Sequence, residues 1–417
     1  MITGEAAITV QFTKSSTMVE INLVKQNAEG KGMLVSAVKE QGKPLRFEQD
    51  SDVIKVYTEV QAGQEHTYII NYSGIPADGL IISTNKFKHR TFFGDNWPNR
   101  AHHWLPCVDN LADKASLEFE VTAPAHYQVI ANGLKKEEKL LPNQLKVTRW
   151  QETADLPTDV MVIGVAEFSI KESGKPDGIP VYTYVFPENE KVGFHDYAVA
   201  AQILPFYIKQ FGAYSYPKLA NVQSKTIFGG MENAGAIFYF EESVGDKGIE
   251  ELMAHEIAHQ WFGDAATEKN WANLWLSEGF ATYMTNYYLE RKYGVDTLRK
   301  RLEQQRKKVI GFERRHFAPV VDTAVHSNYM QLLNANSYEK GAWVLHMLRR
   351  KLGEAAFWQG IRNYYAQCRG HNADTEDLKH IMEQASGQNL QQFFQQWLYT
   401  AGAPNVNFEW KLSLIHI

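Results

Sequence analysis

The chain has 417 residues, more than one hydrophobic core usually serves, so we expect two main domains. A hydrophobic content of 44% and a charged content of 22% exclude a disordered, collagen-like or disulfide-built chain. The formal net charge of -5 provides no basic surface for a phosphate backbone, so no nucleic acid partner is expected.

The first part of the chain alternates apolar and polar residues with a period of two, which is the pattern of half-buried strands. These segments are rich in β-branched and aromatic residues and are separated by Gly, Pro, Asn and Asp, which favour turns. They read AITVQF, VEINLV, HTYIINY, ASLEFEVTAP, DVMVIGVAEFSI and IPVYTYVF. We therefore predict an N-terminal antiparallel β domain over residues 1–188.

The period changes after a polar, proline-containing stretch at 186–193, and the following half is mainly helical. The first amphipathic helix is predicted at 197–212. Further helices are predicted at 249–266, 274–293, 296–313, 335–352, 354–368, 375–386 and 390–399. One island at 221–240 has strand character around a glycine-rich middle. This pattern predicts a second domain over residues 189–402.

The cysteines and the apolar runs indicate the environment in which the protein is expected to work. The two cysteines, Cys107 and Cys368, are too few to staple a chain of this size and are expected to be reduced and buried. No apolar run approaches the ~20 residues needed to cross a bilayer, so no membrane span is expected. A cytoplasmic location is favoured because no signal peptide is visible. The oligomeric state is not predicted.

The segment HEIAH at 255–259 places two histidines four residues apart, on one face of the predicted helix. His255 and His259 can therefore present their imidazoles to one metal ion. Glu278 lies on the following helix among apolar neighbours, where an unpaired carboxylate would be costly, so it is predicted as the third ligand. Two His, one Glu and a water are a common ligand set of catalytic zinc. We predict one zinc ion per chain.

The acid between the two histidines suggests the reaction. Zinc lowers the pKa of its bound water to about 7, and a nearby carboxylate can accept the proton as that water attacks a carbonyl. Glu256 is the candidate general base. Another zinc class has a third histidine six residues after the second, but that position here is Ala265. Peptide hydrolysis is the predicted reaction class.

Four segments, in order and spacing, resemble the zinc aminopeptidases of the aminopeptidase N family, a gluzincin family. They are GGMENAG at 229–235, HEIAH at 255–259, LWLSEGFATY at 274–283 and SYEKGAWVL at 337–345. A fifth, LPCVDNLADKASLEFEVTAP at 105–124, is similar to part of that family's N-terminal domain. The resemblance implies an α+β fold. A saddle-like antiparallel β-sheet domain would precede a thermolysin-like, mainly helical catalytic domain, with the active cleft where they meet.

The resemblance also implies roles for individual residues. Zinc would be bound by His255, His259 and Glu278, with Glu256 as general base. Glu232 would hold the α-ammonium group of the substrate, and Tyr338 would donate its hydroxyl to the oxyanion. The remaining substrate contacts would come from Gly229, Gly230, Met231 and Asn233.

Some features depart from the family pattern. Many relatives supply a second amine-binding acid or amide at the position that aligns with Trp97, and Asp95 or Asn96 could take that place. His102 and His103 are expected to be core or interface residues. The N-terminus looks clipped, and residues 403–417 are expected to be the truncated start of a C-terminal β domain or a tail, with the origin of its end, from Lys411 to Ile417, open.

The leading hypothesis is a zinc-dependent aminopeptidase that acts on peptides with a free N-terminus. Two alternatives remain: a thermolysin-like endopeptidase, and a non-catalytic peptide-binding fragment, which the missing ends suggest. The preferred N-terminal residue is not predicted, and the sequence offers no test of an epoxide hydrolase side activity.

Overall fold

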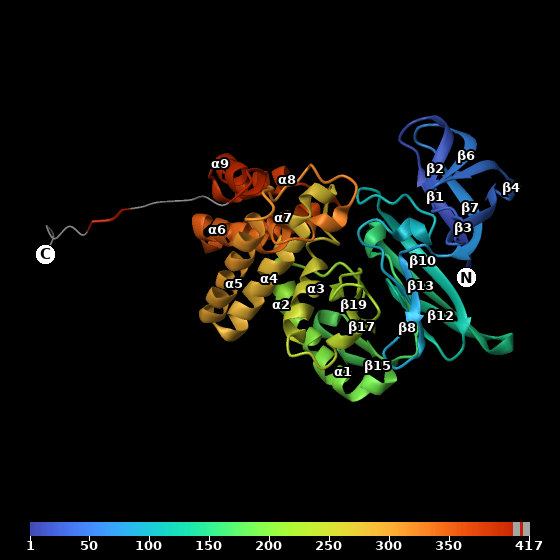
Figure 1. The fold of residues 1–417 in the computed structure, drawn as a ribbon, viewed down its shortest axis with the longest axis horizontal. Coiled ribbons are helices and arrows are strands. Elements are labelled where there is room, and N and C mark those ends of the chain that lie inside the picture. The colour runs from blue at the N-terminus through green and yellow to red at the C-terminus, as the bar shows by residue number, and fades with distance from the viewer. Residues whose placement is uncertain (403–408, 412–417) are drawn as a thin grey trace.

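The computed structural model describes residues 1–402 and 409–411, with strands at the N-terminal end of the molecule and helices at the other (Figure 1). Most of the segment predicted as a C-terminal tail, 403–417, therefore lies outside the described residues. None of the helices in the described part of the chain is long and apolar enough to cross a bilayer.

The N-terminal half is built from four antiparallel sheets, which confirms the predicted antiparallel β domain. The first two sheets are β1 (Ile2–Gln11), β7 (Glu65–Ile75), β3 (Gly32–Glu40), β4 (Lys43–Pro44), and β2 (Ser16–Asn22), β6 (Val53–Val60), β5 (Arg46–Asp50). The other two are β11 (Gln128–Ala131), β14 (Ile163–Ala166), β9 (Arg90–Gly94), β8 (Leu80–Thr84), and β10 (Ala115–Pro124), β13 (Leu145–Leu156), β12 (Leu134–Leu141). Burial alternates along β1 and β13, as expected for strands with one covered face.

A fifth, mixed sheet joins the two halves of the chain. Its order is β15 (Ser169–Gly174), β16 (Val181–Val185), β17 (Leu219–Ser224), β19 (Ala236–Phe240) and β18 (Gly230–Met231). The first two strands precede residue 188 and the others follow it, so this sheet runs across the predicted domain boundary. The boundary itself stays a prediction. A small sheet pairs β20 (Thr267–Glu268) with β21 (Asn372–Ala373).

The helices lie close to their predicted positions. They are α1 (Glu190–Asp196), α2 (Ala200–Phe211), α3 (Ile249–His259), α4 (Trp275–Tyr293), α5 (Val295–Glu313), α6 (Gly341–Leu352), α7 (Glu354–Cys368), α8 (Thr375–Ser386) and α9 (Gln391–Phe394). A π-helical turn, Asn336–Lys340, leads into α6. Asp374 and Asp377 form a capping box at the start of α8.

The predicted helix over 249–266 is wrong in its last turns, because α3 ends at His259. Gly263 has a φ of +122°, which no helical residue adopts, and the chain turns back there. A Cβ atom at this position would lie 2.4 Å from Ser277 Oγ, so the turn also needs a residue without a side chain.

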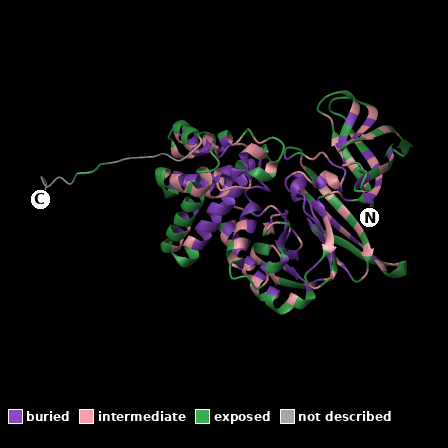
Figure 2. Cartoon of the chain, in the orientation of Figure 1, coloured by how far each residue is buried: buried purple, intermediate pink, exposed green. Residues whose placement is uncertain are grey.

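Two hydrophobic cores lie on either side of the mixed sheet. Ile237 and Tyr239 of β19 point into the core formed with the helices, and Ala236 and Phe238 point into the core of the β domain. This alternation follows from the period of two along a strand. Figure 2 shows the buried residues on both sides of the junction. Strand β18, the carrier of the predicted substrate contacts, therefore lies where the two cores meet.

Candidate active site

The three predicted zinc ligands lie together, on the facing helices α3 and α4. His255 Nε2 is 3.1 Å from His259 Nε2, and each of these atoms is 3.2 Å from Glu278 Oε2. Spacing of four residues brings the two imidazoles to one face of α3. The carboxylate comes from the first turn of α4, which packs directly against α3.

These three atoms fit one tetrahedral zinc ion. Two ligand atoms about 2.0–2.1 Å from one ion and at the tetrahedral angle lie roughly 3.3 Å apart. The three observed separations, 3.1–3.2 Å, are close to that value. Two imidazole nitrogens and one carboxylate oxygen also form the donor set that catalytic zinc uses. Within the described residues, this is the one group of three or more His, Cys, Asp or Glu with ligand atoms so close.

Neighbouring groups orient two of the ligands. His259 Nδ1 lies 3.2 Å from the Phe262 carbonyl oxygen and 2.9 Å from Ser277 Oγ. A proton on Nδ1 satisfies the carbonyl and leaves Nε2 unprotonated for a metal. Tyr338 donates its hydroxyl to Glu278 Oε1 over 2.6 Å, so the other oxygen of that carboxylate remains directed at the histidines.

The π-helical turn that precedes α6 positions Tyr338. In this turn the Lys340 amide bonds to the Ala335 carbonyl, five residues back. The Tyr338 ring stacks on the His255 ring, with centroids 6.0 Å apart and an interplanar angle of 12°. The predicted oxyanion donor thus lies beside the metal ligands, close enough to reach a group bound there.

Glu256, the predicted base, is part of α3, and its side chain lies against strand β18. Its side chain is buried, and a Cβ atom on Gly230 would lie 2.3 Å from its Oε1 atom. Glycine at 230 therefore lets the carboxylate lie against the strand backbone. Burial raises the pKa of Glu256 well above its usual value, His259 opposes this, and Glu232 and Glu278 raise the pKa further.

Glu232 directly follows β18, the last strand of the mixed sheet. Its main-chain carbonyl accepts a hydrogen bond of 2.6 Å from Gln260 Nε2, one residue beyond the metal ligand His259. Burial raises the pKa of the Glu232 carboxyl, His259 lowers it, and Glu278 raises it. Glu232, Glu256 and Glu278 are therefore close enough to influence each other's charge.

The other predicted substrate contacts differ in accessibility. Gly229 is exposed and Gly230 half-buried, so the backbone at the start of β18 can be approached from solvent. One edge of β18 pairs with β19, and no other described strand pairs with the opposite edge. An open edge is where an extended peptide can add. Met231 and Asn233 are buried, and the Asn233 amide has no hydrogen-bond partner among the described residues.

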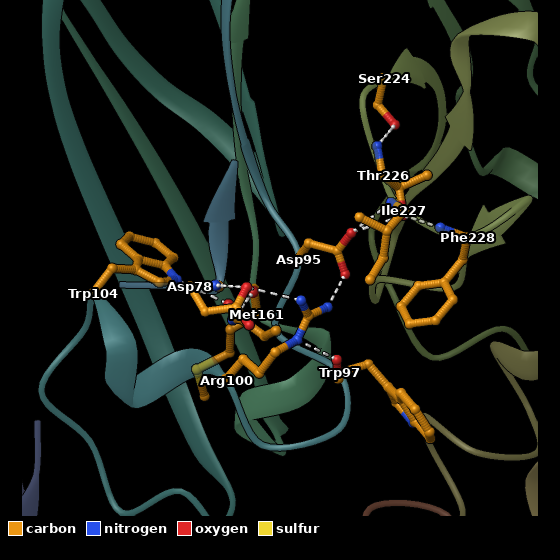
Figure 3. A network of polar contacts seen from close by, with 12 residues as sticks. Asp78, Asp95, Trp97, Arg100, Trp104, Met161, Ser224, Thr226, Ile227 and Phe228 are labelled. Atoms are coloured by element: carbon orange, nitrogen blue, oxygen red, sulfur yellow. Dashed lines mark hydrogen bonds and ion pairs between the residues drawn. The ribbon is translucent and has the colours of Figure 1, made fainter. Parts of the chain in front are cut away.

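The residues considered as a second amine ligand are engaged elsewhere, as Figure 3 shows for Asp95. Asp95 is fully buried, and both its carboxylate oxygens accept hydrogen bonds from protein groups. Asn96 donates to the carbonyls of Thr158 and Met161 and accepts from Trp104 Nε1. Neither side chain is available to a substrate amine.

Trp97 is a core residue, and the neighbouring histidines His102 and His103 are half-buried. The Trp97 ring packs edge-on against Phe228 and Trp271, with centroid distances of 5.8 and 5.4 Å. His102 Nδ1 is 2.5 Å from an oxygen of Asp109, and His103 Nδ1 is buried. Both cysteines are also buried and unpaired, as expected.

A cavity of about 490 Å³ opens beside the metal ligands. Its walls include His255, Tyr338 and Gly229, so it is continuous with the candidate metal site. Helices α4 and α5 contribute the far wall, with Thr282, Thr285, Arg301, Gln305 and Lys308. These residues were not predicted, because nothing in the sequence of α5 distinguishes a cavity wall from a solvated helix face.

Comparison with known proteins places the chain near a set of peptidases. The model of the peptidase family M1 domain matches residues 195–397, and the model of the peptidase M1 N-terminal domain matches residues 1–160. The mitochondrial aminopeptidase 2 of Saccharomyces cerevisiae is 32% identical over 332 residues, which are 74% of this chain and 34% of that protein. Aminopeptidase M1 of Arabidopsis thaliana is 28% identical over 389 residues, 88% of this chain and 44% of that protein. The chain thus spans between a third and a half of the length of these relatives.

Among solved structures, the M1 zinc metallopeptidase of Deinococcus radiodurans has a similar fold. The TM-score is 0.80 at 23% identity, with 97% of this chain and 90% of that chain covered. At this identity the likeness bears on the fold alone. It agrees with a β domain followed by a mainly helical domain.

Proposed function

The chain belongs to peptidase family M1, and from this premise we propose that it is a zinc-dependent aminopeptidase, which hydrolyses the N-terminal peptide bond of peptides. His255, His259 and Glu278 hold the zinc, and Glu256 is the general base. Zinc, when bound, acidifies a water molecule and polarises the carbonyl group of the scissile bond. The single observation that carries the proposal is the position of Glu232, at the end of an open-edged strand that packs against Glu256.

The substrate N-terminus is recognised by charge. Glu232 accepts hydrogen bonds from the α-ammonium group, and a charge-assisted bond of this kind is lost when the amine is acetylated. The substrate backbone pairs with the open edge of β18 at Gly229 and Gly230. Because the distance from Glu232 to the metal ligands is fixed by the sheet, one residue fits between the amine and the bond that is cleaved.

The proton transfers belong to Glu256. Its raised pKa suits a group that takes a proton from water and later gives it to the departing amine. Tyr338 donates its hydroxyl to the carbonyl oxygen on which negative charge develops, and to do so it exchanges its bond with Glu278. The peptide beyond the cleaved bond occupies the 490 Å³ cavity between α3, α4 and α5.

Free peptides are therefore the proposed substrates. The expectations of a cytoplasmic location and of no nucleic acid partner stay predictions.

The test compares L-leucine p-nitroanilide with its N-acetyl derivative. We expect the free amine to be hydrolysed at least 100-fold faster, and the Glu232→Gln variant to lose most of that difference. Glu303→Gln, on an exposed position of α5, is the matched control and should behave as wild type. Equal rates on the two substrates in the wild type would instead indicate the endopeptidase alternative.

A second variant separates an enzyme from a peptide-binding fragment. Glu256→Gln keeps the shape of the side chain but cannot accept the proton, so turnover should fall by about 10³-fold or more while zinc content stays at one per chain. Absence of turnover in the zinc-loaded wild type would favour the non-catalytic fragment.

A further inference from the structure

The segment that carries the predicted substrate contacts is held at both ends by the N-terminal half of the chain. It runs from Thr226 to Gly235 and includes β18 and Glu232. Between its ends, the described main-chain contacts of β18 are those to β19. Glu232 itself is held by the bond from Gln260 Nε2 to its carbonyl, and the front contact sets the course of the strand that leads to it.

Asp95 holds the front end (Figure 3). One carboxylate oxygen accepts a hydrogen bond of 3.0 Å from the Thr226 hydroxyl and another of 3.0 Å from the Ile227 amide. The other oxygen accepts a bond of 2.6 Å from Arg100. All three donors point at one carboxylate that is 0% exposed. Removing one partner of such a buried carboxylate costs free energy, because a charged or polar group is then left buried without a partner.

Arg100 fixes Asp95 within its own loop. The guanidinium also donates to the Trp97 carbonyl over 2.7 Å and to Asp78 over 2.9 Å. The Asp95 amide bonds to the Gly79 carbonyl. The carboxylate is thus anchored to the β domain independently of the segment that it holds.

The rear end is fixed by a separate set of contacts. Asn132 Nδ2 donates to the Ala234 carbonyl over 2.9 Å, and the Ala234 amide donates to the Val160 carbonyl. Lys218 donates to the Gly235 carbonyl, and Gln260 Oε1 accepts from the Gly235 amide. Because the rear end, β19 and Gln260 also hold the segment, we expect loss of the front contact to shift the start of β18 without releasing the segment.

We propose that Asp95 is a positioning residue for amine recognition: it holds Thr226 and Ile227 so that β18 and Glu232 keep their distance from the metal ligands. The inference rests on the proposed aminopeptidase function. It differs from a direct role in amine binding, because both carboxylate oxygens of Asp95 are occupied by protein donors and the side chain has no exposed surface.

The test is steady-state kinetics of Asp95→Asn with zinc-loaded protein and L-leucine p-nitroanilide. We expect KM to rise about tenfold and kcat to change less than threefold, because the interaction weakened is made in the ground state as well as in the transition state. The inhibition constant of free L-tryptophan, a probe of amine binding that needs no chemistry, should rise by a similar factor. Asp78→Asn touches Arg100 but not the segment and is the matched control, expected within twofold of wild type.

Thr226→Val provides a variant that leaves the buried charge pair intact and removes one of the two donors. We expect a KM increase of about threefold with unchanged kcat. A purely structural role would lower the active fraction, and hence kcat, with KM unchanged. That result in Asp95→Asn, or wild-type KM and inhibition constants in both variants, overturns the proposal. If the wild type itself does not discriminate against the acetylated substrate, the proposed function fails instead.

Discussion

The contact between α4 and the turn before α6 offers a sharp test of the site, because two glycines meet there. Gly279 follows the ligand Glu278, and Gly341 begins α6. A Cβ atom on Gly279 would lie 2.9 Å from Gly341 Cα and 3.0 Å from the Ser337 carbonyl oxygen. Both are main-chain atoms, which cannot rotate away as the end of a side chain can.

We predict that Gly279→Ala separates these two elements. Ordinary contacts of a Cβ atom begin near 3.4 Å, so the backbones must move apart by roughly 0.5 Å, and overpacking of this kind costs about 1–3 kcal/mol. The same movement pulls Tyr338 from Glu278, which are now joined by a bond of 2.6 Å. Misplacement of about 1 Å at a reacting group can cost about 10²-fold in rate, so we expect kcat to fall by about 10-fold to 100-fold.

The assay combines thermal unfolding, zinc content and kcat on L-leucine p-nitroanilide. Gly311→Ala is the matched control, since it lies within α5 and, apart from its chain neighbours and the backbone of its own helix, no described atom lies within 4 Å of its added Cβ. This control should be neutral or more stable by about 0.5–1 kcal/mol, because alanine favours a helix interior. Wild-type melting temperature and kcat in Gly279→Ala would refute the reasoning.

Three further predictions concern charge and metal. Burial raises the pKa of Asp159 to about 8, and the charges of Glu232 and Asp109 add to the rise. The folded state therefore keeps a proton that the unfolded state releases above pH ~3.9. The free energy of unfolding of the wild type consequently falls as the pH rises from about 4 to 8. The free energy of unfolding of Asp159→Asn, measured with urea at pH 5, 6 and 7, should therefore rise relative to that of the wild type by up to about 1.4 kcal/mol per pH unit. A difference between the two proteins that stays constant with pH would contradict this. Ser277→Ala removes the oxygen 2.9 Å from His259 Nδ1 and should weaken zinc binding about 10-fold in a chelator competition, with kcat of the zinc-saturated protein changed little. Removal of zinc by a chelator should abolish hydrolysis and lower the melting temperature, and both should return when zinc is added; a melting temperature that does not move would place the metal elsewhere.

Local periodicity was sufficient to predict most of the fold. Strands such as Ala115–Pro124 and helices such as Thr375–Ser386 were located by their spacing of apolar residues, because each buries one face. The end of α3 was mispredicted because the residues after His259 keep an apolar, helix-like composition, and only the φ of Gly263 shows the turn.

The candidate site was predictable where its parts are close in sequence. His255, Glu256 and His259 belong to one helix, so their spacing in the sequence predicts their relative positions. Glu232 and Tyr338 required the resemblance to known aminopeptidases, since neither spacing nor composition links them to α3. The contact between Asp95 and Ile227 spans 132 residues and joins two ordinary loops, and no local pattern signals such a pair.

The charges of the site explain why a free N-terminus would matter so much. Glu256 and Glu278 are buried and Glu232 is half-buried. With all three carboxylates ionised and both imidazoles neutral, the site carries three negative charges. One divalent zinc and one α-ammonium group supply three positive charges, and only together do they balance the site. A blocked substrate leaves one carboxylate shielded from water without a partner. Breaking one member of a buried pair costs about 3–5 kcal/mol, which corresponds to at least two powers of ten in rate. Discrimination against N-acetyl substrates by less than tenfold would mean that water still reaches Glu232 when the substrate is bound.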